Sequence, residues 1–189
     1  MTIKATTVGQ FRDDLDAMAA ARMGLTQYRD FLDHRTRDDK RLREELLPIL
    51  AVVRWLDLQD DEVIELGGET EDFDARIRGE PYEVVQALPE DEHEVRRSLC
   101  KGQSPYIYLK HSADHLQFPE VVIDAIDRKH EMHYSDKRHL AIAFDGDYSE
   151  EDDRVIDSWI AKVREKSHLG RFRSILLVER ARLKVFSVL

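Results

Sequence analysis

The sequence predicts an α/β domain in which a mixed central sheet is flanked by helices, with a helical pair at its N-terminal end. Three observations predict this class. Apolar residues follow helical spacing in the first third of the chain, strand-like alternation replaces it in the middle, and helical stripes then alternate with short apolar runs. Such an order is typical of a mixed sheet covered by helices.

Composition narrows the class of protein further. The chain has 189 residues, of which 42% are hydrophobic, so it can bury the core of one domain without a metal or disulfide. We therefore expect a single domain over 1–189, with an N-terminal helical part (1–58) and an α/β core (60–189). The single cysteine, Cys100, and the lack of an apolar N-terminal run lead us to expect a cytoplasmic protein. No stretch of the sequence approaches the roughly 20 apolar residues that a membrane span requires.

The helical pair is predicted over residues 9–33 and 38–58. The apolar positions at helical spacing include Phe11, Leu15 and Met18 in the first range and Leu42, Leu46, Ile49 and Val53 in the second. Pro48 should kink the second helix or begin a fresh turn, because proline lacks the N–H that a helix interior uses.

The rest of the chain is predicted to alternate strands and helices. A strand over 63–66 ends at Gly67, and residues 72–88 form two strands around Gly79. The later elements are a helix from 88 to about 99, an extended run at 106–109, a helix opened by Pro119 at 119–134, a strand at 139–144, a helix at 150–165 with a capping box of Ser149 and Asp152, and strands at 172–178 and 183–188.

The hairpin at 72–88 carries acidic residues on one face. A turn centred at 79–80 would place Arg76 opposite Glu83. Because side chains alternate along a strand, Asp74 and Glu83 then share a face, and their carboxylates could share one Mg²⁺. The alternative is that Arg76 and Glu83 form an ordinary cross-strand ion pair on a solvated face.

The segment EDFDARIRGEPYEVVQ (71–86) resembles the signature of the PD-(D/E)xK, or restriction-endonuclease-like, nuclease superfamily. In that signature an acid on one strand and an ExK motif on its hairpin partner follow a helix that can supply a further glutamate. The resemblance implies that Asp74, or alternatively Asp72, is the first catalytic acid and Glu83 the second. It also implies that Asp74 and Glu83 bind Mg²⁺ or Mn²⁺.

The resemblance extends beyond the hairpin. It implies that Glu45, or alternatively Glu44, is the optional third carboxylate, on the preceding helix. Gln86 is a further catalytic candidate, although its parity turns it toward the core. Residues 125–144 (AIDRKHEMHYSDKRHLAIAF) resemble the basic helix leading into an apolar strand that small predicted nucleases of this superfamily carry after the core.

Two residues depart from the signature. Glu71 stands in place of the proline, and Val85 stands in place of the lysine that would orient the attacking water and stabilise charge on the phosphate. A cation from the following helix could substitute, and His93, Arg96 and Arg97 are the candidates there. If none reaches the acids, the domain binds rather than cuts.

Charge is unevenly distributed along the chain. The formal net charge of −10 disfavours non-specific attachment to a polyanion, but basic residues gather at 171–184. The candidate phosphate-binding residues are Arg171, Arg173, Arg180 and Arg182. The leading hypothesis is a divalent-metal-dependent nuclease acting on DNA or RNA. The alternative is a catalytically inactive nuclease-fold protein that serves as a protein-interaction or nucleic-acid-binding module.

Overall fold

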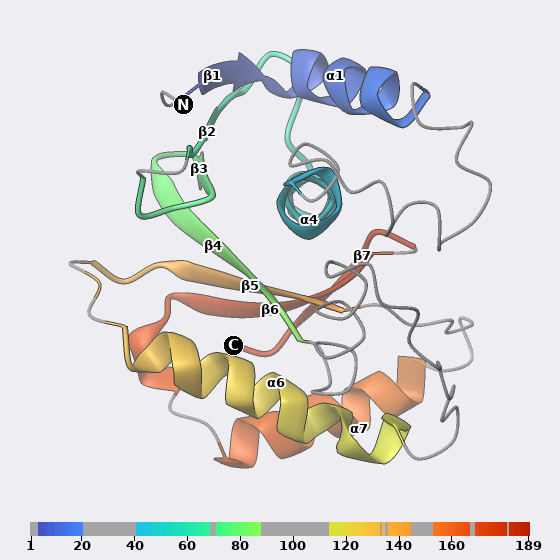
Figure 1. The fold of residues 1–189 in the computed structure, drawn as a ribbon, viewed down its shortest axis with the longest axis vertical. Coiled ribbons are helices and arrows are strands. Elements are labelled where there is room, and N and C mark those ends of the chain that lie inside the picture. The colour runs from blue at the N-terminus through green and yellow to red at the C-terminus, as the bar shows by residue number, and fades with distance from the viewer. Residues whose placement is uncertain are drawn as a thin grey trace, which may run out of the picture.

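The computed structural model describes residues 4–20, 41–68, 71–87, 114–132, 134, 136–144, 153–166, 169–180 and 182–189. Its strands form a seven-stranded sheet whose spatial order follows the sequence (Figure 1). The strands are β1 Lys4–Thr7, β2 Val63–Leu66, β3 Ala75–Ile77, β4 Glu80–Gln86, β5 His139–Phe144, β6 Ser174–Glu179 and β7 Lys184–Ser187. The described helical elements are α1 Val8–Ala20, the π-helical turn η1 Leu42–Leu46, α4 Leu47–Trp55, α6 Asp114–His130, α7 Asp153–Lys166 and the 3₁₀ turn η3 Leu169–Arg171.

The sheet is mixed, as the sequence predicts. The pairs β1–β2, β2–β3 and β3–β4 are antiparallel, the pairs β4–β5 and β5–β6 are parallel, and β7 is antiparallel to β6. Helix α6 lies between β4 and β5 in the chain, and α7 between β5 and β6, because parallel neighbours require a crossover. Figure 1 shows α6 and α7 on one side of the sheet and α4 with α1 on the other.

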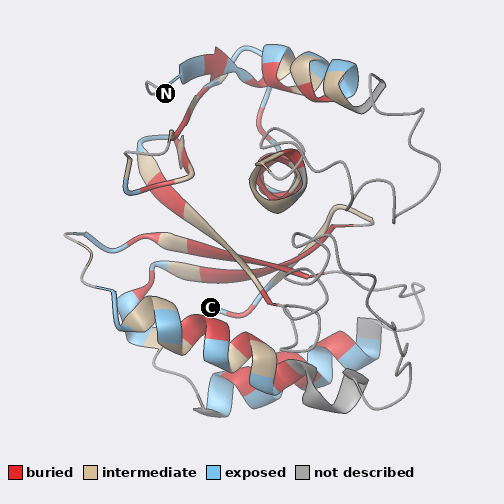
Figure 2. Cartoon of the chain, viewed as in Figure 1, coloured by how far each residue is buried: buried red, intermediate tan, exposed pale blue. Residues whose placement is uncertain are grey.

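Each face of the sheet packs against its own apolar core. Residues of α1 and α4 pack with Ile64, Ala75, Tyr82 and Leu176 on one face, and residues of α6 and α7 pack with Leu140, Ile142, Ile175 and Leu177 on the other. Strands β5 and β6 are almost entirely buried (Figure 2), which explains their unbroken apolar runs.

The N-terminal third differs from the expected helical pair. Strand β1 precedes α1 at the edge of the sheet, and its sequence KATT carries no apolar alternation that predicts it. Helix α1 ends the described range at Ala20, so most of the expected second half of the 9–33 helix lies outside the described residues. In the second range η1 gives way to α4 at Leu47, with Pro48 in the first turn, where a missing N–H costs little.

Other boundaries also shift. Helix α6 begins at Asp114 rather than Pro119, so the proline lies inside the helix and removes one backbone hydrogen bond instead of opening it. The expected helix at 88–99, the extended run at 106–109 and the Ser149–Asp152 capping box lie outside the described residues. Among the helices that the structure describes, none has the length and apolar character to cross a bilayer.

The hairpin turn is one residue earlier than expected. Arg78 and Gly79 form it, with φ angles of 51° and 81°, and this pair of positive values is the signature of a type I′ turn. The pairing therefore becomes Arg76 with Pro81 and Ala75 with Tyr82. The register differs from the expected one by two residues, so the residues that share a face are unchanged.

We expect Gly79→Ala to lower the free energy of unfolding by about 1 kcal/mol, because only glycine adopts a positive φ without penalty. A Cβ at this position meets nothing within 4 Å, so the cost is conformational and not steric. Gly170→Ala is the control, since its Cβ also meets nothing within 4 Å and its φ lies outside the left-handed region. Equal denaturant midpoints for the two variants would contradict the turn assignment.

Candidate functional site

Asp74 and Glu83 lie together on the face of the hairpin that α6 covers. The backbone N–H of Asp74 donates to the Tyr82 carbonyl at 2.9 Å, which joins the residue before β3 to β4. The Asp74 carboxylate then accepts a hydrogen bond from the Val84 N–H at 2.6 Å. This bond holds the Asp74 side chain against β4 next to Glu83.

The backbone after β2 lies close to the backbone at Asp74 and holds this residue in place. The N–H of Gly67, just after β2, donates to the Asp74 carbonyl at 2.9 Å, and Arg41 donates to the Gly67 carbonyl at 2.6 Å. A Cβ on Gly67 would lie 1.9 Å from the Phe73 carbonyl oxygen, so any side chain there would force the two segments apart. Gly67 thus allows the chain after β2 to support the site from behind.

Asp74 carries an unusual proton affinity. Burial, followed by the negative charges of Glu83 and Glu45, raises its pKa from 3.8 to about 7, against the opposing effect of the Val84 N–H. Glu45 comes from η1 and also pairs with Arg41 at 3.4 Å. The charges of three candidate carboxylates therefore influence one another at this corner of the sheet.

Two cations reach Glu83, and neither is Arg76. Lys129, in the last turn of α6, forms an ion pair with Oε1 of Glu83, and Arg138 lies 3.4 Å from Oε2. Arg76 pairs instead with Glu65 at 3.0 Å, so the ordinary cross-strand pair considered above does not form. Val85, at the expected lysine position, packs against the core under α6 and α7.

Arg138, directly before β5, ties the site together. Its guanidinium is 1% exposed and contacts the Asp72 carbonyl, the Asp72 carboxylate at 3.2 Å and the Asp136 carboxylate at 3.0 Å. It also stacks 3.6 Å from the centre of the Tyr134 ring. Burial, and then the negative charge of Glu83, raises the pKa of the Tyr134 hydroxyl. Asp72 is therefore a partner of Arg138 at the exposed rim of the site.

Gln86 links the sheet to η1. Its amide donates to the Glu44 carbonyl at 2.6 Å and accepts from Arg180 at 2.6 Å. The parity expected from the sequence agrees with this direction, since Tyr82 and Gln86 point to the α4 side of the sheet. Gln86 thus positions the turn that carries Glu45.

The four candidate phosphate-binding arginines lie at opposite ends of β6. Arg171 and Arg173 are exposed before the strand, where Arg173 pairs with Glu80 at 2.8 Å. Arg180 is 5% exposed beyond its other end, and Arg182 pairs with the buried Glu179. They do not form one exposed patch.

Sequence reasoning missed Lys129, Arg138 and Tyr134. Each is distant in the chain from the hairpin, and only the parallel pairing of Glu83 with Leu140 brings the start of β5 beside it. The basic last turn of α6 was the available signal, since a crossover helix returns its C-terminal end to the start of the next strand. The previously expected cations His93, Arg96 and Arg97 lie outside the described residues.

Asp74 and Glu83 offer a divalent cation two carboxylates. Within the described ranges no group of three or more His, Cys, Asp or Glu residues stands ready to hold a metal. Mg²⁺, however, keeps several waters and binds proteins through one or two carboxylates. Burial, and after it the negative charges of Glu83 and Glu45, raises the pKa of Asp74, and a bound cation would favour its ionised form, so Asp74 and Glu83 are compatible with Mg²⁺ or Mn²⁺.

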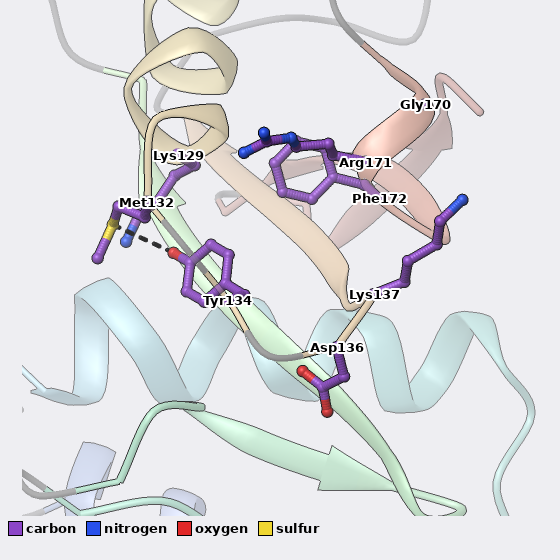
Figure 3. A pocket seen from close by; sticks show the side chains of 8 residues that line it. All are labelled: Lys129, Met132, Tyr134, Asp136, Lys137, Gly170, Arg171 and Phe172. Carbon is purple, nitrogen blue, oxygen red and sulfur yellow. Dashed lines mark hydrogen bonds between the residues drawn. The ribbon is translucent and has the colours of Figure 1, made fainter.

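A pocket of about 330 Å³ opens beside these residues (Figure 3). It lies between the segment that leaves α6 and the η3 turn. Its lining residues are Lys129, Met132, Tyr134, Asp136, Lys137, Gly170, Arg171 and Phe172. Lys129 belongs both to this pocket and to the Glu83 ion pair, so it links the pocket to the acids.

No protein-family model matches the chain, and neither a curated protein nor a solved structure is significantly similar to it. The chemistry of the site is therefore inferred from its own residues.

We expect Arg138→Ala to lower the free energy of unfolding by about 3–5 kcal/mol, because it removes a buried cation and leaves Glu83 with one partner fewer. Arg173→Ala is the matched control. Its exposed pair with Glu80 should contribute less than about 1 kcal/mol. Urea denaturation of both variants tests this difference, and equal losses would show that the Arg138 contacts are not structural.

Asp74→Asn should stabilise the protein at pH 8 in EDTA and have little effect at pH 4. The folded pKa of Asp74, about 7, lies above its ordinary value of 3.8, so stability is lost as pH rises between these values. Because a tenfold change in proton affinity corresponds to about 1.4 kcal/mol, we expect a gain of about 2–4 kcal/mol at pH 8. Asp157→Asn, on the exposed side of α7, is the control and should be neutral at both pH values. A pH-independent effect of Asp74→Asn would contradict a raised pKa.

Proposed function

We propose that the protein is a divalent-metal-dependent nuclease that hydrolyses phosphodiester bonds of DNA or RNA on a restriction-endonuclease-like, PD-(D/E)xK scaffold. One observation carries the proposal. Lys129 forms an ion pair with Glu83 on the face that also holds Asp74, so α6 supplies the cation that Val85 cannot. With this lysine the two acids and one ammonium of the signature are present together.

The order of elements supports the same scaffold. A helix carrying Glu45 precedes a hairpin that bears both acids, and the basic end of α6 leads into the apolar strand β5. This is the layout that the resemblance of residues 71–86 and 125–144 implies.

Each residue has a defined role in the proposal. Asp74 and Glu83 bind Mg²⁺ or Mn²⁺, with Glu45 as an auxiliary carboxylate. The bound ion would lower the pKa of a coordinated water and neutralise charge on the phosphate. Lys129 orients the phosphate and stabilises the charge that develops on its oxygens. Before the ion binds, the raised pKa leaves Asp74 partly protonated near neutral pH, and the proton would sit on Oδ1, because Oδ2 accepts the Val84 N–H.

The remaining candidates act at a distance from the reaction. Arg138 fixes Glu83 and Asp72, and Gln86 fixes the η1 turn, so both are positioning residues. Phosphate contacts outside the site are assigned to the exposed Arg171 and Arg173. Arg180 is buried against Gln86 and takes a structural role.

A second candidate function is a non-catalytic interaction module on the same scaffold. The observation that favours it is the double ion pairing of Glu83 with Lys129 and Arg138. Two cations neutralise this acid without a metal, as in a purely structural cluster.

The test is cleavage of labelled single- and double-stranded DNA and RNA with Mg²⁺ or Mn²⁺. We expect cutting that EDTA abolishes. The cleavage rate should fall at least about 100-fold in Asp74→Asn, Glu83→Gln and Lys129→Met, because each substitution removes a charge that acts on the transition state. Lys162→Met, on the exposed side of α7, is the control and should cut at the parental rate.

The result that would overturn the nuclease proposal is no cutting of any of the four substrates by a parental protein that unfolds cooperatively. That outcome favours the interaction module. Cutting that persists in Asp74→Asn and Glu83→Gln would place the activity elsewhere or in a contaminant.

A further inference from the structure

The pocket beside the candidate site is lined by aromatic and sulfur-containing side chains and by cationic side chains. Tyr134 and Phe172 contribute aromatic rings, and Met132 contributes a thioether that accepts a hydrogen bond from the Tyr134 hydroxyl at 3.2 Å. Figure 3 shows these side chains around the same opening, with Lys137 and Arg171 at its edge. The volume of about 330 Å³ lies at the small end of the range for organic ligands, which is about 300–1,000 Å³.

The charge of the pocket is positive. Lys137 is exposed, and within the described part of the chain no carboxylate lies at ion-pair distance from it or from Arg171. Arg171 donates one hydrogen bond to the His130 carbonyl, which aligns its guanidinium without neutralising it. Asp136 also lines the pocket, but Arg138 already pairs with it at 3.0 Å.

Tyr134 connects the pocket to the acids. Tyr134 lines the pocket and Arg138 covers one face of its ring, so only the opposite face could stack on a ligand. Lys129 reaches from the pocket wall to Glu83. Two residues that line the pocket, Lys129 and Tyr134, therefore contact Glu83.

We infer that this pocket receives one unstacked base of a single-stranded nucleic acid, next to the phosphate that the site would cleave. The base stacks on Tyr134, and the flanking phosphates contact Lys137 and Arg171. Aromatic walls with adjacent cations are the arrangement by which proteins bind single strands, since every base has a face that can stack. The identity of the substrate rests on the proposed nuclease function, but binding to the pocket does not require catalysis.

The geometry selects single strands over duplexes. In a duplex each base is paired and stacked, and extruding one costs stacking and pairing energy that a single strand does not lose. DNA and RNA share the base and phosphate chemistry that the pocket recognises, so both are used in the test.

The experiment measures binding in EDTA, where no metal-dependent cleavage occurs. A labelled single strand of about 12 nucleotides, as DNA and as RNA, is titrated with the protein by fluorescence anisotropy, alongside the same strand with abasic sites and a duplex. Tyr134→Leu removes the ring, and Tyr134→Phe keeps it while losing the hydroxyl hydrogen bonds to Met132 and Glu83. Lys137→Glu reverses a charge in the pocket, and Lys162→Glu makes the same change on the exposed side of α7.

We expect Tyr134→Leu to weaken binding of the single strand about tenfold, and Tyr134→Phe, which keeps the stacking ring, to weaken it much less than Tyr134→Leu does. Lys137→Glu should weaken binding more than Lys162→Glu. Abasic strands and duplexes should bind the parental protein about as weakly as the normal strand binds Tyr134→Leu. The comparison of the two Tyr134 variants requires that they have the same thermal unfolding temperature. Lys137→Glu is an independent test, because the Lys137 side chain makes no hydrogen bond or ion pair within the described residues.

Equal affinity for normal and abasic strands, or equal effects of Lys137→Glu and Lys162→Glu, would overturn the pocket assignment. Metal-dependent cleavage that survives both pocket substitutions, with unchanged binding, would refute the pocket while the nuclease proposal stands. Base-dependent binding without any cleavage would refute the nuclease proposal while the pocket stands.

Discussion

The buried guanidinium of Arg138 is the interaction on which the candidate site depends. It joins the segment before β3 through Asp72, strand β4 through Glu83, and the segment before β5 through Asp136. Removing such a charge from water costs several kcal/mol unless it is paired on several sides, and here its partners come from three parts of the chain. The start of β5 is therefore placed against the hairpin by electrostatics, while the apolar cores above and below the sheet hold the layers together.

The two acids of the hairpin occupy contrasting environments. Asp74 is buried beside other carboxylates and receives one backbone hydrogen bond, so its pKa is raised. Glu83 is a neighbour on the same face but is neutralised by Lys129 and Arg138. Neighbouring titratable groups with opposed environments are a recurring feature of sites that handle protons and charge. The contrast arises because Lys129 and Arg138 form ion pairs with Glu83 itself, whereas for Asp74 burial outweighs the charge of Lys129.

Local patterns predicted much of the fold, and non-local contacts account for what they missed. The run at 139–144 has the boundaries of β5 because burial on both faces leaves an unbroken apolar signal. Face sharing by Asp74 and Glu83 survived a register error, since the error was an even number of residues. The error itself arose because Arg78 adopts a positive φ, which composition does not reveal. Lys129 was hidden because no local pattern tells which distant strand a helix end will approach.

The origin of the charges in different parts of the chain has a consequence for how the protein folds. Glu83 lies 46 residues before Lys129 and 55 residues before Arg138, whereas the hairpin that carries both acids is local and closes with a two-residue turn. A hairpin of this kind forms on the microsecond scale, well before contacts that close long loops. In the early chain its acids repel one another without compensation. Docking of α6 and β5 brings Lys129 and Arg138 to Glu83, so neutralisation of this acid is coupled to extension of the sheet beyond the hairpin.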